Sequence, residues 1–376
     1  IGRIEVPATG YMQEWELAPG EQREVRLPSA IWYPEGSEEV GIFGVKVSAD
    51  RDIEAVALHW RLYFSEASRL LPIDELDGDY RVLTVPDAMG SGPNGFIVLA
   101  TEDNTEVAIT PAAFTYGLRP EDVEYSVILN EGEVWPVHAD GDLSGSRVRS
   151  VGGAPIAVFA GAKQPWVGCT AGANSHVWDQ LPPVDRWGRH TVVVPFARRS
   201  ADTVRMVAHE DGTEVQVDCG PPTVLDAGEP MSLEISDTTS ITSSAPVLVA
   251  QVMQGGDCGT GGSVGDPNLV FATPAPLTRI DARVTVPLAT ESLASATRHV
   301  GVWSPEGDAV EIDDGTPLDA GRGATGTLDG GIHTLTADGP FNGTVYALGV
   351  YDALTWTLGY DCVGCVLDLD EAPACD

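Results

Sequence analysis

Lysine is almost absent from this chain of 376 residues: it occurs only at Lys46 and Lys163. The 21 basic residues are outnumbered by 56 acidic ones, and the formal net charge is −35. Such a chain repels a phosphate backbone, and its few scattered cations supply no basic face, so nucleic acid is excluded as a partner. Apolar residues make up 43% of the sequence, which is enough for a large core and excludes disorder for the bulk of the chain.

Long hydrophobic runs are also missing. The longest, 154–162 and 247–253, fall well short of the roughly 20 residues that a membrane helix needs. No basic segment followed by an apolar leader precedes residue 1, and the chain opens inside a strand-like pattern. We therefore expect the numbering to begin after processing or within a longer precursor.

Cysteine is sparse, with six residues in the chain. This number is too small for a disulfide scaffold but suits an exported protein that is stapled at a few loops. Cys362, Cys365 and Cys375 lie close together in an acidic stretch with no neighbouring histidine. A zinc site would need a fourth ligand, so we favour disulfides over metal for these three cysteines.

Glycine and proline, with 42 and 27 residues, separate short runs that are rich in valine, threonine and isoleucine. No segment of about 12 residues or more shows helical periodicity, so the chain is predicted to be all-β. In residues 204–217, two alternating runs flank Asp211-Gly212. This dipeptide tolerates a positive φ and suits a tight hairpin turn.

The sequence repeats itself. Residues 100–107, Ala-Thr-Glu-Asp-Asn-Thr-Glu-Val, return as Ala-His-Glu-Asp-Gly-Thr-Glu-Val at 208–215 and more loosely at 303–310. A second element, typified by 148–159 and 241–250, alternates with the first. Counting both kinds predicts seven hairpins with an average step of about 50 residues. They start near residues 44, 96, 148, 204, 239, 298 and 333.

This step favours an all-β repeat architecture of the seven-bladed β-propeller type. The alternative is three to four tandem β-sandwich modules, because two hairpins together are about the size of an immunoglobulin-like domain. The continuous apolar strand 96–100 favours the propeller, which would bury it on both faces. We expect a single repeat domain over residues 1–361, followed by a cysteine- and acid-rich tail or linker at 362–376.

Several short blocks of the sequence, taken in their order along the chain, form a recognisable pattern. They are Asn-Glu-Gly-Glu-Val-Trp at 130–135, Ala-Pro-Ile-Ala-Val-Phe-Ala-Gly at 154–161, Asp-Gln-Leu-Pro-Pro at 179–183 with Trp187-Gly188, and Gly-Asp-Pro at 265–267. In this order they resemble the IgGFc-binding protein N-terminal domain family, over about residues 40 to 360. The resemblance implies an extracellular or cell-surface binding or adhesion module without catalysis, here a bacterial surface-protein member. Immunoglobulin binding belongs to the animal protein that names the family and transfers poorly to so acidic a chain.

The two longest connections, 164–185 and 254–276, are where we expect binding to concentrate, since long structured loops on a rigid scaffold carry function. The first mixes aromatic and polar side chains that suit stacking on a sugar or anchoring a protein. The alternative is that its tryptophans seal gaps between repeats. The candidate binding residues are Trp166, His176, Trp178, Asp179, Gln180 and Trp187.

Each of these connections holds one cysteine, Cys169 and Cys258, at nearly the same offset from the preceding hairpin. A bridge between the two would hold both loops together, which we state as a hypothesis.

Asp140, Asp142 and Ser144 begin a segment that resembles the first half of a calcium loop, in which alternating oxygens converge on one hard cation. The acid expected at the twelfth position is Val151 instead, so half of the ligand set is missing. A side-chain-capped turn is therefore favoured over a calcium site. Calcium is the one cofactor that the sequence suggests.

The sequence contains one match to a catalytic motif, but the residues around it do not have the structure that the motif requires. Residues 261–265 have the letters of a Gly-x-Ser-x-Gly elbow but lie in a glycine-rich loop with no helix after it. The seven histidines are dispersed, one in each element, so a histidine cluster would depend wholly on tertiary convergence. We therefore expect no enzyme.

The predicted function is recognition of an extracellular glycan or protein through loops. One alternative is a self-associating structural subunit of a surface layer or an extracellular filament, whose net charge would need screening by salt. A second is a propeller-type glycosidase, which would need paired carboxylates. The dense acidic cluster within the repeats is typical of a solvated loop and consists of Asp74, Glu75, Asp77 and Asp79.

Overall fold

The computed structural model describes residues 1–28, 36–61, 64–87, 89–90, 92–169, 174–258, 262–275, 279–286, 293, 295–313, 315 and 317–359. The predicted tail 362–376, with Cys362, Cys365 and Cys375, lies outside these described residues. Within them the regular elements are β-strands and short 3-10 turns, which confirms the all-β prediction. No helix among the described residues is long and apolar enough to cross a membrane.

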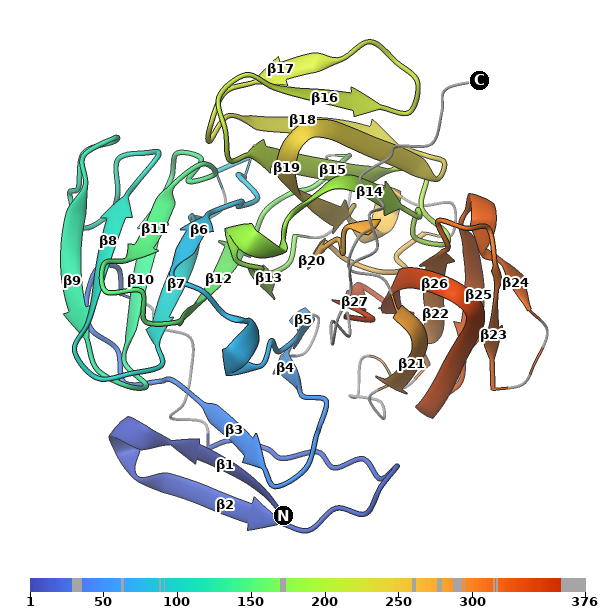
Figure 1. The fold of residues 1–376 in the computed structure, drawn as a ribbon, viewed down its shortest axis with the longest axis horizontal. Coiled ribbons are helices and arrows are strands. Elements are labelled where there is room, and N and C mark those ends of the chain that lie inside the picture. Colours follow the sequence, from blue (N-terminus) through green and yellow to red (C-terminus); the bar gives the residue numbers. More distant parts are fainter. Residues whose placement is uncertain are drawn as a thin grey trace.

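The first complete unit of the fold is a β-sandwich, which we call module 1 (Figure 1). Its strands form two four-stranded sheets, in the orders β10-β7-β12-β13 and β6-β11-β8-β9. Phe96 and Val98 of one sheet share a buried apolar cluster with Val107 and Ile109 of the other. The strands are β6 (Asp79–Arg81), β7 (Asn94–Ala100), β8 (Thr105–Thr110), β9 (Tyr125–Leu129), β10 (Val134–Ala139), β11 (Arg147–Ser150), β12 (Ile156–Ala162) and β13 (Val177–Gln180).

Module 2 repeats this pairing around one long strand, β19 (Thr239–Met253). Its first part, residues 239–243, pairs with β14 and β16, and its later part, residues 247–253, pairs with β15 and β20. The strand β19 therefore takes the places of both β11 and β12. The other strands are β14 (Gly188–Val193), β15 (Asp202–Ala208), β16 (Thr213–Val217), β17 (Thr223–Leu225), β18 (Pro230–Ile235) and β20 (Asn268–Phe271).

Module 3 has the same plan, with β26 (Gly331–Gly349) as its long strand. Residues 331–336 pair with β21 and residues 342–349 pair with β22 and β27. The same strand also pairs with β23, as β19 does with β16. The remaining strands are β21 (Arg279–Val286), β22 (Thr297–Trp303), β23 (Ala309–Ile312), β24 (Leu318–Asp319), β25 (Ala324–Leu328) and β27 (Asp352–Thr357).

The N-terminal strands repeat the second half of this plan. The strand β1 pairs with β2 and β3, as β8 pairs with β9 and β11, and β4 pairs with β5, as β12 pairs with β13. We call these five strands the N-terminal unit. They are β1 (Gly2–Val6), β2 (Tyr11–Trp15), β3 (Lys46–Ala49), β4 (Val56–Arg61) and β5 (Phe64–Arg69).

The seven-bladed propeller is not confirmed, whereas tandem β-sandwich modules, the alternative, fit the strand pairings. The propeller prediction assumed that the two strands on either side of each predicted turn pair with each other. Gly212 does turn the chain, with a φ of 70°, but β15 and β16 on either side of it do not pair with each other. The turn connects strands that pair with different halves of β19, so two predicted hairpins make one module.

The strand 96–100 also differs from the expectation. Phe96, Val98 and Ala100 are fully buried, but Ile97 and Leu99 between them are only half-buried. The strand therefore turns one face into a sandwich core and leaves the other partly open, as a sandwich strand does.

The last strands of the four units meet at the centre of the molecule (Figure 1). The strand β5 packs against β13, β13 against β20, β20 against β27, and β27 against β5 again, so these strands close a ring. Side-chain hydrogen bonds join neighbours, including Ser65 Oγ to Asp352 Oδ2 at 2.9 Å and the Phe271 amide to Asp179 Oδ2 at 3.0 Å. The closed arrangement of repeats is thus real, although its units are sandwiches.

Candidate binding face

The hypothesised disulfide is present. Cys169 and Cys258 are bonded, with an S–S distance of 2.07 Å and 89 positions between them in the sequence. The first lies in the loop between β12 and β13 of module 1, and the second follows β19 of module 2. The amide of Gly255 also donates to the carbonyl oxygen of Val167 at 3.1 Å. The two long loops are therefore joined, as predicted.

Module 3 adds a third segment to this region. The amide of Gly265 donates to the Gly349 carbonyl oxygen at 2.7 Å, and the amide of Tyr351 donates to the Ser263 carbonyl oxygen at 2.9 Å. The hydroxyls of Ser263 and Tyr351 lie 2.7 Å apart. We call the surface made by residues 164–169, 254–258, 262–267 and 349–351 the disulfide face. Loops from three modules meet there, which no single module could provide.

Most of the predicted binding residues are buried. Trp178, Asp179, Gln180 and Trp187 are between 5% and 8% exposed, whereas Trp166 and His176 are half-buried. The indole of Trp187 donates to the Pro182 carbonyl oxygen at 3.1 Å. Trp178 and Trp187 are thus buried, which fits the alternative that we gave for the tryptophans.

Asp179 and Gln180 hold the ring together. Gln180 Oε1 accepts a hydrogen bond from the Leu71 amide at 2.9 Å, next to the N-terminal unit. Asp179 accepts from the Phe271 amide of module 2 and from the Gln180 amide. Burial raises the pKa of Asp179 to about 7, although these backbone donors act in the opposite direction. The block 179–183, which carries the family resemblance, is thus part of the central scaffold.

The predicted calcium residues take part in a polar network between modules 1 and 2. Asp142 Oδ2 lies 2.7 Å from Arg205 Nη2, and its other carboxylate oxygen accepts from the Thr84 hydroxyl and the Ser144 amide, each at 2.9 Å. Asp140 accepts from the Tyr116 hydroxyl. A calcium ion would have to share Asp142 with a guanidinium group. Binding of calcium here stays a prediction.

One histidine cluster does form. His59, Glu66 and His176 place one potential metal-ligating atom each within 4.8 Å of one another. His176 Nδ1 lies 2.5 Å from Glu66 Oε2, and His59 Nδ1 lies 4.0 Å from the same oxygen. The two imidazole rings meet edge to face, with 4.9 Å between their centroids. No local pattern in the sequence indicates this cluster, because its members lie up to 117 positions apart.

Burial governs the charges of this cluster. It raises the pKa of Glu66 well above its ordinary value, against the opposing effects of His59 and the Trp178 amide. It also lowers the pKa of His59, assisted by His176, and lowers that of His176 to about 3, assisted by Lys163. Both imidazoles are therefore neutral at physiological pH.

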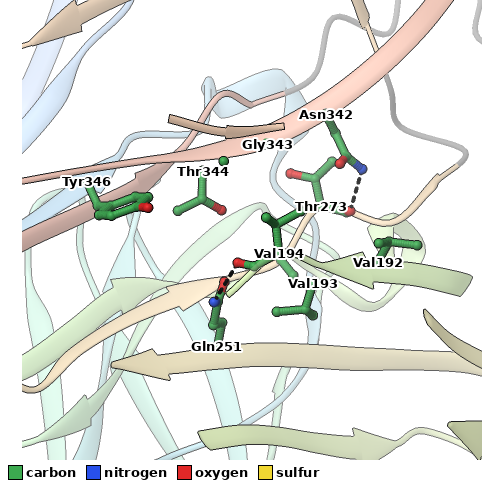
Figure 2. Close-up of a pocket in the computed structure, with 11 residues that line it drawn as sticks. Val192, Val193, Val194, Gln251, Thr273, Asn342, Gly343, Thr344 and Tyr346 are labelled. Atoms are coloured by element: carbon green, nitrogen blue, oxygen red, sulfur yellow. Dashed lines mark hydrogen bonds between the residues drawn. The ribbon is translucent and has the colours of Figure 1, made fainter. Parts of the chain in front are cut away.

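Two pockets bear on the glycosidase alternative, and the described residues that line them include no pair of carboxylates. One, between modules 2 and 3, is lined by residues including Val194, Gln251 and Tyr346, and Figure 2 shows Gln251 donating to the Val194 carbonyl oxygen at 2.9 Å. Burial raises the pKa of Tyr346 to about 12, so its phenol stays neutral. The second pocket, at the ends of the ring strands, has Asp179 as the only carboxyl among its described lining residues. Neither offers the two acids of a glycosidase.

A pH effect on stability arises beside the first pocket. Asp202 is fully buried, accepts from the Phe196 amide and from Gln251 Nε2 at 2.7 and 2.8 Å, and has a pKa that burial raises from 3.8 to about 7. Between about pH 4 and pH 7 the unfolded chain has lost this proton while the folded chain keeps it, so stability falls as the pH rises.

We expect Asp202→Asn to remove this dependence, because the amide oxygen can still accept both hydrogen bonds. The variant should lose less stability than the natural chain between pH 5 and pH 8, by a difference on the order of a few kcal/mol. Urea unfolding at the two pH values measures this. An equal loss in both proteins would show that Asp202 is already ionised at pH 5.

Sequence reasoning also missed an exposed loop between β8 and β9. Phe114, Tyr116 and Leu118 are 58%, 48% and 73% exposed. The loop is nevertheless well fixed, since Thr115 Oγ1 donates to Glu38 Oε2 at 2.7 Å. The run Phe-Thr-Tyr-Gly-Leu between two acidic turns was the only available signal.

These features define a class of protein: a closed ring of tandem β-sandwich modules that offers joined loops rather than a cleft with paired acids. The family model described as IgGFc binding protein matches residues 66–347, and the chain belongs to this family. The human IgGFc-binding protein is 28% identical over 219 residues, which are 56% of this chain and 4% of that protein. The chain thus spans only a small fraction of the curated relative that it matches.

Proposed function

We propose that this chain is an extracellular binding module that holds a protein or glycan partner through the disulfide face, without catalysing a reaction. The observation that carries this proposal is the Cys169–Cys258 bond between loops of two modules. A covalent bond between surface loops reduces the conformational entropy that a partner would have to remove on binding. Disulfides also persist in oxidising, extracellular compartments.

The surface itself has the chemistry of a binding site. Val350 is 52% exposed, and Trp166 is half-buried. Met89 is 59% exposed, and its backbone amide and that of Trp166 both donate hydrogen bonds to Asp87 Oδ1. A partly exposed tryptophan suits stacking on a sugar ring or anchoring in a protein pocket. Asp257 adds a carboxylate that accepts from the Ser263 amide at 2.9 Å.

Family membership supports binding as the activity, and the relative's name states that it binds the Fc part of immunoglobulin G. We do not extend that ligand to this chain, because the match covers 4% of the human protein. Immunoglobulin Fc is still a useful probe, since it separates a family-wide ligand from one particular to this chain.

The test is a binding screen of the purified chain on a glycan array and on immobilised immunoglobulin G Fc, each with and without calcium. We expect at least one surface to retain the chain, and Trp166→Ala to weaken that binding by tenfold or more. Leu118→Ser, on the exposed β8–β9 loop, is the matched control and should bind normally.

Two outcomes would overturn the proposal. Loss of binding in Leu118→Ser with normal binding in Trp166→Ala would move the site to the β8–β9 loop. Ordered filaments or layers in negative-stain images of the same sample, with no retention on any surface, would instead support the structural alternative.

A further inference from the structure

The histidine cluster joins two units of the ring. His59 on β4 and Glu66 on β5 are directly opposite each other in the antiparallel pairing of the N-terminal unit. His176 immediately precedes β13, the last strand of module 1, and β5 packs against β13. The ring therefore brings together side chains that neither unit contains on its own.

The distances suit a small metal ion after a slight adjustment. Zinc binds imidazole nitrogen and carboxylate oxygen at about 2.0–2.2 Å, which puts tetrahedral ligands about 3.3 Å apart. Glu66 Oε2 lies 2.5 Å from the nitrogen of His176 and 4.0 Å from that of His59. These two separations lie on either side of the required value, and all three ligating atoms lie within 4.8 Å of one another, so side-chain rotations that move these atoms by about 1 to 1.5 Å would complete the geometry.

The burial of the Glu66 carboxylate favours the binding of a cation. The side chain of Glu66 is 4% exposed, and its Oε1 has no hydrogen bond of normal geometry to any of the described residues. A buried carboxylate is costly unless a partner satisfies it. His59 is 50% exposed, so an ion has a route from solvent to the cluster.

We propose that His59, Glu66 and His176 bind one Zn²⁺ ion, which clamps the N-terminal unit to module 1. Two nitrogen donors with one carboxylate favour zinc over calcium, which prefers six to eight oxygen ligands. Three protein ligands leave a fourth position for water or for a group from a partner. The clamp would act between these units as the Cys169–Cys258 bond acts between modules 1 and 2.

Lys163 is a basic group close enough to help lower the pKa of His176, and its positive charge would also repel a bound metal ion. Its side chain is exposed, so solvent and salt screen its repulsion of a bound cation. The ring centroid of Trp178 lies 5.8 Å from that of His176. A paramagnetic ion bound at the site should therefore quench the fluorescence of Trp178.

The experiment is a titration of the chelator-treated full chain with Zn²⁺ by calorimetry and with Co²⁺ by visible absorption. We expect one equivalent of metal, the d–d bands of four-coordinate Co²⁺, and a higher unfolding temperature in the presence of Zn²⁺. His59→Ala and Glu66→Gln should each weaken binding by about a hundredfold. His59 is half exposed, so this variant should keep its fold, which circular dichroism checks.

His333→Ala is the matched control. His333 Nδ1 also lies 2.5 Å from a carboxylate, that of Asp313, but within the described residues no third ligand accompanies this pair. Its loss should leave metal binding unchanged. Metal binding that survives both His59→Ala and Glu66→Gln, or the absence of a stoichiometric site, would overturn the proposal and leave the proposed partner binding untouched.

Discussion

The double substitution Cys169→Ser with Cys258→Ser should lower the free energy of unfolding by about 2–4 kcal/mol. The bond spans 89 positions, and closing a loop of that length in the unfolded chain corresponds to roughly 4.5 kcal/mol of chain entropy in the simplest model. Relaxation of the native loops reduces the observed value. Unfolding in guanidinium chloride, followed by circular dichroism, gives the measurement.

The control for this prediction is Ser263→Ala on the same face. It removes the hydroxyl contact with Tyr351 but leaves the disulfide in place, and it should cost about 1 kcal/mol. Partner binding should fall more in the cysteine variant than in this control, because the control keeps the covalent bond between the loops of modules 1 and 2. Equal unfolding midpoints for the cysteine variant and the natural chain would contradict the expected role of the bond.

The second large effect is expected at the ion pair between modules 1 and 2. Asp142→Ala should destabilise the chain by about 2–3 kcal/mol, because it leaves the guanidinium of Arg205 without its charged partner. The Arg205 side chain is 9% exposed and then keeps only the hydroxyls of Ser144 and Ser232, each at 3.1 Å. Asp142 is 29% exposed, so solvent lowers the cost below that of a fully buried pair.

An exposed ion pair supplies the matched control. Arg3 and Glu14 lie 2.8 Å apart with side chains 46% and 51% exposed, and Glu14→Ala should leave the unfolding midpoint nearly unchanged because solvent screens the pair. Both variants should be measured with and without calcium. A stabilisation of the natural chain by calcium that Asp142→Ala abolishes would support the calcium loop instead of the ion pair alone.

The sequence was most informative about local structure. Alternating valine and threonine runs predicted strands, and Asp211-Gly212 predicted a turn that the structure contains. It was wrong about what lies across that turn, because a dipeptide that allows a positive φ reverses or bends the chain without selecting the partner of either strand. Pairing was decided by β19, whose 15 residues serve both sheets.

The candidate site shows the same division. The equal offsets of Cys169 and Cys258 in two repeats predicted their bond, because equivalent positions in adjacent repeats lie near each other. Trp178 and Trp187 were candidates for a binding surface, with the sealing of gaps between repeats as the alternative, and both are buried in the structure. The chemical character of tryptophan suits either place, so the sequence could not choose between them. Phe114 and Tyr116 were not singled out, although their loop is among the most exposed apolar segments described.

The sequence by itself determined the all-β class, the repeat and the family, and it suggested the disulfide as a hypothesis, because these depend on residue patterns that are local or recur at a fixed spacing. Only the tertiary structure decided that two repeats form one sandwich, that four last strands close a ring, and that His59 meets His176. Contacts across a closed ring join positions far apart in the chain, and no local pattern encodes them.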